Sequence, residues 1–271
     1  MFVSFNIDLG IREVRQVTGF LKEKYGLEYA DYALTAFKRR LENFLRTSRY
    51  GVDELLKKME SADFIDHFAG QIAVAETEMF RDPTFWILLK NNYIANFIKE
   101  QPKVKIWLPM CASGEEYFSL AILLKEAGWS EKVEVYVSSM SKEALETIKH
   151  GSMDAEKVEV SSKNYSRFQG TKNFNDYFKT IGNTVTFDKT LFHNTKFFKE
   201  GLDFSTELPH LHLILFRNKF IYFNPSLQYK VCDALYNKLA VKGLLALGIL
   251  EEVEGKFVPI NKNESIFQRR G

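Results

Sequence analysis

Cysteine is scarce in this sequence, with only Cys111 and Cys232 among 271 residues. Their number and spacing exclude a disulfide framework and a zinc site of the paired-cysteine type. The N-terminus lacks the basic and then apolar pattern of a signal peptide, and no apolar run approaches the roughly 20 residues that span a bilayer. We therefore expect a cytoplasmic protein that does not insert into a membrane.

An excess of charge of one sign is also missing. The 37 Lys and Arg residues nearly balance the 35 Asp and Glu residues, which leaves a formal net charge of +2. Such a balance gives no general attraction to nucleic acid or to an anionic membrane. Internal repeats and low-complexity segments are absent as well. The 45% of hydrophobic residues, with 24 Phe among them, is an ordinary globular composition, and the length suits one large domain with a small partner.

The first 70 residues predict a small helical domain, because apolar residues recur there at helical spacing without strand-like alternation. The clearest predicted helix runs from Tyr32 to Arg46. Its apolar face comprises Leu34, Phe37, Leu41, Phe44 and Leu45. The basic residues of the region are Lys38, Arg39, Arg40, Arg46 and Arg49. This basic surface either receives an acidic partner or is an ordinary solvated helix surface, and the pattern leaves both interpretations open.

Residues 71–271 predict an α/β domain in which strands alternate with helices. The predicted strands are residues 105–111, 133–137, 211–216 and 244–250, and the predicted helices are residues 115–126, 142–150 and 225–240. Gly243 is expected to cap the last of these helices. Residues 256–260 and 265–269 predict a closing hairpin. Residues 151–189 fit neither the helical nor the strand periodicity and are taken as an insertion. The alternation is typical of a doubly wound, Rossmann-like parallel sheet.

The loop after the first strand, residues 109–116, has one glycine followed by Glu115 and Glu116 at the start of a helix. In doubly wound sheets the ligand lies beside this loop, and a dinucleotide places its pyrophosphate on the helix N-terminus. Two carboxylates there compete with a phosphate for the positive end of the helix. A cofactor with a sulfonium and an amino group but no phosphate, such as S-adenosylmethionine, suits the loop. Alternatively, the two acids only complement the helix dipole.

Three motifs resemble one known family. Residues 111–121 (CASGEEYFSLA), residues 216–223 (FRNKFIYF) and residues 77–82 (TEMFRD) are similar to segments of the CheR-type chemotaxis receptor methyltransferases, in the same order. The resemblance covers nearly the whole chain. It implies a small N-terminal helical domain, a Rossmann-like methyltransferase domain and an inserted subdomain at 151–189 that helps to hold receptors. It also implies methyl transfer from S-adenosylmethionine to glutamate side chains of an acidic helical protein, such as the cytoplasmic part of a chemoreceptor.

The resemblance also implies roles for particular residues. Arg81 and Tyr222 are the expected catalytic residues, and Arg39 and Arg40 are expected to bind the substrate. The expected cofactor-binding residues are Thr77, Arg81, Ala112, Gly114, Glu115, Glu116, Ser139, Arg217 and Asn218. Three of these residues have a plainer interpretation: Arg81 as an ion pair with Asp82 or Glu78, Tyr222 as a packing aromatic, and Asn218 as a turn residue.

Several positions depart from the family pattern. Ser139 and Ser141 stand where acidic residues are usual, and Ala75 and Gly201 stand where asparagines are usual. A serine lacks the charge of the acid that holds the ribose hydroxyls. These departures support an alternative function, a noncatalytic module that has lost the cofactor and docks a receptor or signalling partner. Methyl transfer to another acceptor is a third possibility.

The chemistry of carboxylate methylation requires no general base, because a glutamate with a pKa of about 4.3 is already ionised near neutral pH. Alignment of the reacting atoms and removal of water supply the catalysis. The sequence predicts no metal site, since His210 and His212 lack an evident third ligand. Cys111 is expected to be a small packing residue rather than a reactive thiol.

Overall fold

The structure is a computed structural model of the 271-residue chain, and it describes residues 7–27, 29–73 and 78–271. The N-terminal part is helical, and its α-helices are α1 (Ile11–Tyr25), α2 (Leu34–Ser48), α3 (Val52–Lys58) and α4 (Ala62–Ile72). The predicted helix over residues 32–46 is α2, displaced by two residues at each end. Four of its five expected apolar residues are buried, whereas Leu34 is 45% exposed at the first turn.

The remainder of the chain forms an α/β unit. Its helices include α5 (Pro83–Leu88), α6 (Ala95–Glu100), α7 (Glu115–Glu126), α8 (Lys142–His150), α9 (Val158–Arg167) and α10 (Pro225–Lys238). A π-helical turn, η2 (Leu89–Ile94), joins α5 to α6. The strands of the main sheet are β1 (Val104–Leu108), β2 (Val133–Ser139), β6 (Thr195–Lys199), β7 (Leu211–Leu215), β8 (Leu239–Ala246), β9 (Phe257–Asn261) and β10 (Ile266–Arg269).

These strands form a seven-stranded sheet in the order β6-β2-β1-β7-β8-β10-β9. The neighbours from β6 to β8 are parallel, whereas β10 is antiparallel to both β8 and β9. The α/β class with a parallel sheet and a closing hairpin is thus confirmed. The chain proceeds outward from β1 to β2 and β6 and then returns to the other side of β1 with β7. This reversal between β1 and β7 is the topological switch point at which doubly wound sheets bind ligands.

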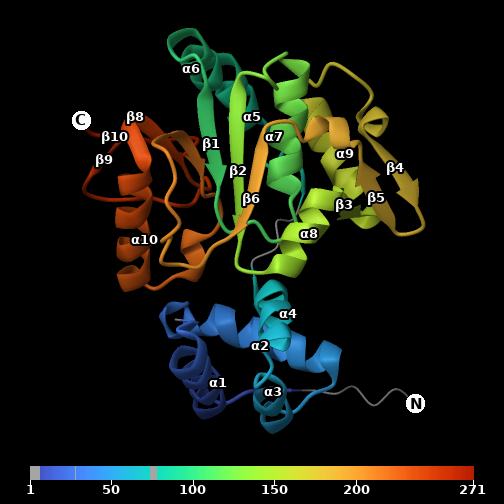
Figure 1. The fold of residues 1–271 in the computed structure, drawn as a ribbon, viewed down its shortest axis with the longest axis vertical. Helices are drawn as coiled ribbons and strands as arrows, with labels where there is room; N and C mark the ends of the chain where they lie inside the picture. Colours follow the sequence, from blue (N-terminus) through green and yellow to red (C-terminus); the bar gives the residue numbers. More distant parts are fainter. Residues whose placement is uncertain (1–6, 28, 74–77) are drawn as a thin grey trace.

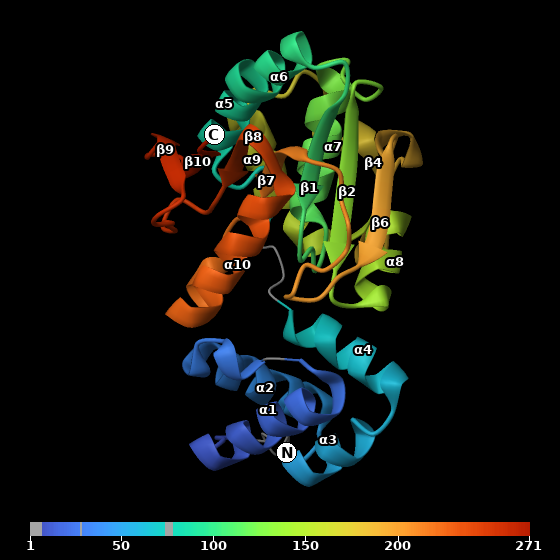
Figure 2. The same ribbon diagram turned by 60° about the vertical axis from the view of Figure 1, so that its left-hand side comes forward.

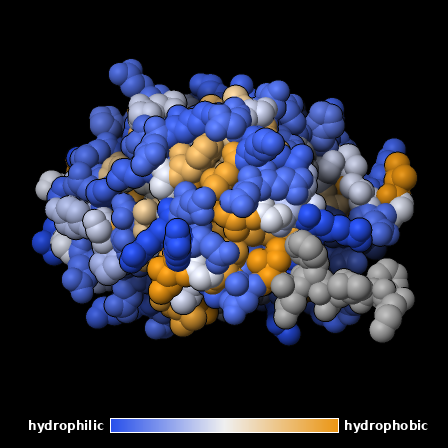
Figure 3. All heavy atoms as spheres, turned by 90° about the horizontal axis from the view of Figure 1, so that it is seen from below, coloured by the Kyte–Doolittle hydropathy of each residue, from blue (hydrophilic) through white to orange (hydrophobic). Residues whose placement is uncertain are grey.

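Two apolar clusters cover the two faces of the sheet. The first contains Ile106 and Leu108 of β1 with buried residues of α5 and α7. The second contains Trp107 of β1 with residues of α10 and of the N-terminal helices. Figures 1 and 2 show the N-terminal helices below the sheet, next to the carboxyl ends of its strands, with α4 beside α8. From the helical end the surface is mostly hydrophilic, with apolar side chains gathered near the centre of the view (Figure 3).

The segment taken as an insertion has structure of its own. It contains α9 and a three-stranded antiparallel sheet in the order β3-β5-β4, built from β3 (Ser152–Asp154), β4 (Phe178–Ile181) and β5 (Thr184–Phe187). Glu126 at the end of α7 accepts hydrogen bonds from the hydroxyls of Tyr165 and Tyr177, which fixes this subdomain to the main sheet unit. The short strands had no clear sequence signal because most of their residues face solvent.

One expected boundary is wrong. Gly243 does not cap the last long helix, because α10 ends at Lys238 and β8 begins at the next residue, Leu239. Gly243 lies inside β8, where a side chain would meet the backbone carbonyls of Ala240 and Leu211 at 2.8 and 2.9 Å. The glycine therefore permits close strand packing at an irregularity in the β7–β8 register. In the described part of the chain, no helix combines the length and the apolar character needed to cross a membrane.

Candidate functional site at the carboxyl ends of the sheet

The loop between β1 and α7 is held in one conformation by Gly114. This residue has a φ of +93°, and a Cβ atom there would lie 2.9 Å from the Phe118 ring and 3.1 Å from Ile148. Both the backbone angle and the packing require glycine. The amide of Cys111 donates to the carbonyl of Ser138 at 2.8 Å, which ties the loop to the end of β2. The loop is thus a fixed platform at the start of α7.

Glu115 begins α7 and is only 1% exposed. Its Oε1 lies 2.5 Å from Lys157 Nζ, and its Oε2 accepts a hydrogen bond of 2.5 Å from the Ser113 hydroxyl. Lys157 belongs to the short helix η3 (Ala155–Lys157) of the subdomain. Ala112, Glu115 and Lys157 all line a cavity of about 600 Å³ that also touches α4 and α8. Glu115 is therefore a buried, ion-paired acid at the wall of a cleft.

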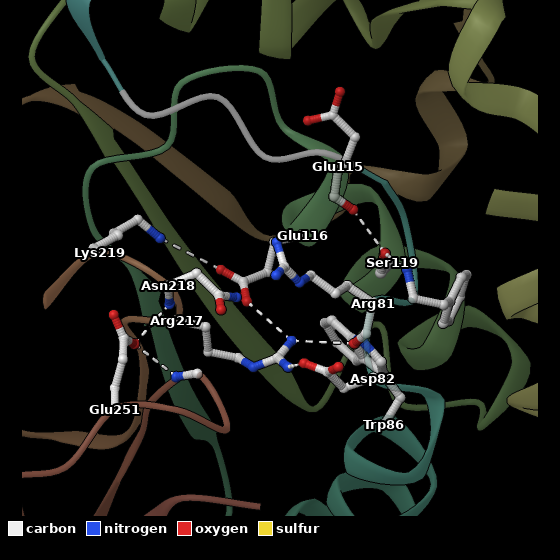
Figure 4. A network of polar contacts seen from close by, with 12 residues as sticks. Arg81, Asp82, Trp86, Glu115, Glu116, Ser119, Arg217, Asn218, Lys219 and Glu251 are labelled. Carbon is white, nitrogen blue, oxygen red and sulfur yellow. Dashed lines mark hydrogen bonds and ion pairs between the residues drawn. The ribbon is translucent and has the colours of Figure 1, made fainter. Parts of the chain in front are cut away.

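Glu116 faces a different set of partners. Its carboxylate lies between two buried cations, with Oε1 3.5 Å from Arg217 Nη1 and Oε2 3.6 Å from Lys219 Nζ. Arg217 also donates to Asp82 Oδ2 at 2.5 Å, and its guanidinium lies 4.1 Å from the centre of the Phe85 ring. We call Asp82, Glu116, Arg217 and Lys219 the buried charge network (Figure 4). It joins β7, α7 and the segment before α5 at the switch point of the sheet.

Arg81 lies at the edge of this network. Its backbone carbonyl accepts hydrogen bonds from Trp86 Nε1 at 2.9 Å and from Arg217 Nη1 at 3.3 Å. Figure 4 shows its side chain extended toward Glu116, while the carboxylate of Asp82 faces Arg217. The nearest acid in the sequence, Asp82, is thus committed to Arg217, and Arg81 is positioned at the end of α7 that carries the two expected cofactor acids.

Asn218 is a turn residue as far as its backbone is concerned, with a φ of +57°. The turn is held by Glu251, which is 3% exposed. The carboxylate of Glu251 accepts from the amides of Asn218 and Gly248, both at 2.7 Å, and of Ile221 at 3.2 Å. Sequence reasoning missed Glu251. Its only signal was an acid directly after an apolar strand, which alone does not distinguish a buried acid from an exposed one.

Tyr222 lies where the helical part meets the sheet unit. Its backbone carbonyl accepts from the amide of Ala33 at 2.7 Å, and the Arg40 guanidinium lies 4.6 Å from the centre of its ring. Arg40 also donates to the carbonyl of Ile72 at 2.7 Å. Burial lowers the pKa of Arg40 from its usual value. Arg40 is thus half-buried beside Tyr222, whereas Arg39 is exposed on α2.

Ser139 ends β2 and is 2% exposed. Its hydroxyl accepts from the amide of Ser141 at 3.4 Å, and Ser141 caps α8 by accepting from the amide of Ala144 at 3.2 Å. Gly201, beyond the end of β6, lines a second cavity of about 510 Å³ together with Met140. The serines are thus structural parts of a turn at the edge expected to hold a ribose. Thr77 and Ala75 lie outside the described residues.

The remaining candidates for chemistry lie away from this edge or are enclosed. His212 Nδ1 accepts from the amide of Lys105 at 3.0 Å. Both residues lie near the amino ends of their strands, β7 and β1, away from the carboxyl edge. Cys111 is fully buried, and its thiol donates to the carbonyl of Leu108 at 3.6 Å. Among the described residues, no group of three or more His, Cys, Asp or Glu side chains is arranged to hold a metal ion.

Comparison with known proteins identifies the family of this chain. Residues 75–266 match the model of the CheR methyltransferase SAM-binding domain. The chain is 26% identical to a protein of Pseudomonas putida that is named "Putative methyltransferase Cher3", over 95% of this chain and 96% of that protein. It is 23% identical to a chemotaxis protein methyltransferase of Listeria innocua, over 87% of this chain and 88% of that protein.

Among solved structures, the N-methyltransferase NodS of Bradyrhizobium japonicum, in complex with S-adenosylhomocysteine, aligns with a TM-score of 0.34 at 8% identity, over 72% of this chain and 70% of that one. The domain model alone matches most of the chain, from the segment before α5 to the closing hairpin. The chain therefore belongs to the CheR methyltransferase family.

Proposed function

We propose that this protein methylates glutamate side chains of an acidic, helical protein of the chemoreceptor type, with S-adenosylmethionine as the methyl donor. We further propose that residues 1–70 act as a helical domain and residues 71–271 as the methyltransferase domain. The donor follows from the family, and the nature of the acceptor is our inference. The observation that carries it is that both acids at the start of α7 are already held by cations, Glu115 by Lys157 and Glu116 by Arg217 and Lys219.

The acids and cations at this edge are engaged with one another. Glu116 lies between Arg217 and Lys219, and Glu115 is paired with Lys157. His67 of α4 lies 2.8 Å from Glu143 of α8, and both side chains are exposed. An amine acceptor must lose a proton before it attacks, whereas a carboxylate with a pKa of about 4.3 is already ionised near neutral pH. The site therefore suits a carboxylate nucleophile better than an amine.

The residues of the site also fit the methyl donor. Two buried acids in the first turn of α7 disfavour a phosphate and suit a ligand that carries positive charge. We propose that Ala112, Gly114, Glu115, Glu116 and Ser139 hold the donor, with Thr77 and Arg81 from the adjoining segment. The bound donor supplies an electrophilic methyl group on a sulfonium.

The chain's own residues orient the acceptor and exclude water. We propose that Arg81 binds the acceptor carboxylate through its forked guanidinium and that Tyr222 positions it from the other side of the cleft. The helical domain holds Tyr222 in place, because Ala33 donates to its carbonyl and Arg40 packs against its ring. We propose that Arg39, which is exposed on α2, contacts the acidic partner. Arg217 and Asn218 support the site through the buried charge network and the Glu251 turn.

The proposal is tested with S-adenosylmethionine labelled on its sulfonium methyl group and with a helical peptide from a chemoreceptor. We expect label to enter the peptide and to be released as methanol by mild alkali, because an ester is alkali-labile and an N-methyl group is not. A matched peptide with Gln in place of each acceptor Glu should take up none, and Arg81→Gln should abolish transfer. Alkali-stable label would contradict a carboxylate acceptor. A protein that binds no S-adenosylhomocysteine would instead support the noncatalytic docking module.

A further inference from the structure

We propose that Asp66, on α4 of the helical part, is a positioning residue of the cofactor site. Its carboxylate holds the turn that carries Ser139 at the ribose side, so that docking of the helical part and binding of the methyl donor are coupled. The inference rests on the donor named above and is independent of the acceptor.

Asp66 makes a dense set of contacts with the sheet unit. Its Oδ2 accepts from the amide of Lys142 at 2.8 Å, the amide of Glu143 at 3.1 Å and the hydroxyl of Ser141 at 3.1 Å. Its Oδ1 accepts from the amide of Lys142 at 3.1 Å and lies 2.7 Å from Lys199 Nζ. These donors use the lone pairs of both oxygens. We call Asp66 and these four partners the Asp66 cluster.

The cluster lies at the ends of two neighbouring strands. Ser139, the last residue of β2, is paired in register with Lys199, the last residue of β6. The amide of Ser141 donates to the Ser139 hydroxyl, and the Ser141 hydroxyl donates to Asp66. In doubly wound folds an acid at the end of the second strand binds the ribose hydroxyls. Here β2 ends in serine, and a carboxylate reaches the same turn from α4.

The packing of α4 makes this arrangement rigid. A Cβ atom on Gly70, one turn after Asp66, would lie 3.0 Å from the Ser141 hydroxyl, so the helix backbone is pressed against the turn. The negative charge of Asp66 also lies at the N-terminus of α8, where the helix dipole favours it. A displacement of α4 would therefore release the turn at residues 139–141. Because coupling is reciprocal, a ligand that needs this turn in place must in turn favour docking of α4.

A second contact between the same two parts of the chain provides a control. Asp31 accepts from Asn224 Nδ2 at 3.3 Å and lies 3.6 Å from Lys230 Nζ, at the start of α10 rather than of α8. Asp31→Asn and Asp66→Asn thus each remove one acid at the boundary between the helical part and the sheet unit. Only the second variant alters the turn that carries Ser139.

The experiment is calorimetric titration of S-adenosylhomocysteine into the whole protein and the two variants. We expect Asp66→Asn to weaken binding by about 10- to 100-fold, as loss of a charged hydrogen bond does, and Asp31→Asn to change it by less than about twofold. Equal affinities for the two variants would overturn the inference. A wild type that binds no S-adenosylhomocysteine would overturn the proposed function as well, so the two failures are distinguishable.

A second measurement separates positioning from general stability. In the wild type we expect S-adenosylhomocysteine to slow hydrogen exchange at the amides of Lys142 and Glu143, which donate to Asp66. The same ligand should give no such protection in Asp66→Asn at saturating concentration, while Asp31→Asn behaves like the wild type. If the ligand leaves exchange at these two amides unchanged in the wild type, docking and binding are not coupled and the inference is wrong.

Discussion

Arg217 offers the sharpest test of the buried charge network. Its side chain is 2% exposed, and it faces both Asp82 and Glu116. Arg217→Met keeps much of the apolar stem but leaves two carboxylates without their shared cation. Removing one partner of a buried ion pair costs about 3–5 kcal/mol. Because a chain of this size loses roughly 2–4 °C per kcal/mol, the midpoint of thermal unfolding should fall by roughly 10 °C.

Lys219→Met is the matched control, because Glu116 retains Arg217 after that change. We expect a smaller loss of about 1–3 kcal/mol. Denaturant unfolding of both variants measures the two losses, provided that the slope with denaturant stays constant. A double-mutant cycle with Asp82→Asn adds the decisive comparison, since the aspartate and arginine changes should be strongly non-additive. A loss below about 1 kcal/mol for Arg217→Met, or simple additivity, would refute the view that this network is a buried, mutually dependent unit.

Three further outcomes follow from single sites. Gly114→Ala should lose about 1–3 kcal/mol of unfolding free energy, more than Gly128→Ala, which also has a positive φ but nothing within 4 Å of the added methyl. Burial raises the pKa of the Cys232 thiol to about 11, and Cys111 is fully buried. Both cysteines should therefore react with a disulfide reagent at pH 8 about 100-fold more slowly than an unhindered cysteine. Fast labelling of either would contradict this. Burial opposes ionisation of Asp66, but Lys199 and the amides of α8 outweigh burial and lower the pKa of this carboxyl group. The difference in unfolding free energy between wild type and Asp66→Asn should therefore be present above about pH 4 and shrink below it. Unfolding measured at pH 7 and at pH 3 checks this.

Much of the fold was predictable because its central strands are short, strongly apolar runs. β1, β2 and β7 and the helices that follow them coincide with the expected segments to within a few residues. The N-terminal helices were also predictable from their spacing. In contrast, the helices between Pro83 and Glu100 and the strand β6 were not among the elements predicted from the sequence. β6 has mixed burial at the edge of the sheet, so its alternation is weak.

The contacts of the site were less predictable than its position. The Gly-Glu-Glu motif located the start of α7, but Arg217 and Asp82 are 135 residues apart, and no local pattern indicates that they meet. The plainer interpretation of Arg81 named Asp82 or Glu78 as its partner, and the carboxylate of Asp82 is bound by Arg217. The sequence pattern of Arg40 likewise gave no sign that it contacts the Tyr222 ring and the carbonyl of Ile72. Such partners depend on how distant elements pack, which spacing does not encode.

The two glutamates of the motif show why adjacent residues can have separate tasks. Successive residues of an α-helix point about 100° apart, so Glu115 and Glu116 leave the first turn of α7 in different directions. Glu115 reaches Lys157 of the subdomain, and Glu116 reaches Arg217 and Lys219 beyond the end of β7 (Figure 4). One short motif thus connects the cofactor loop to both flanks of the cleft. Asp66 likewise reaches the end of β2 from the helical part. Each side of the proposed donor site therefore contains a carboxylate that joins two elements of the fold, and our proposals predict that loss of any one of them affects both packing and cofactor binding.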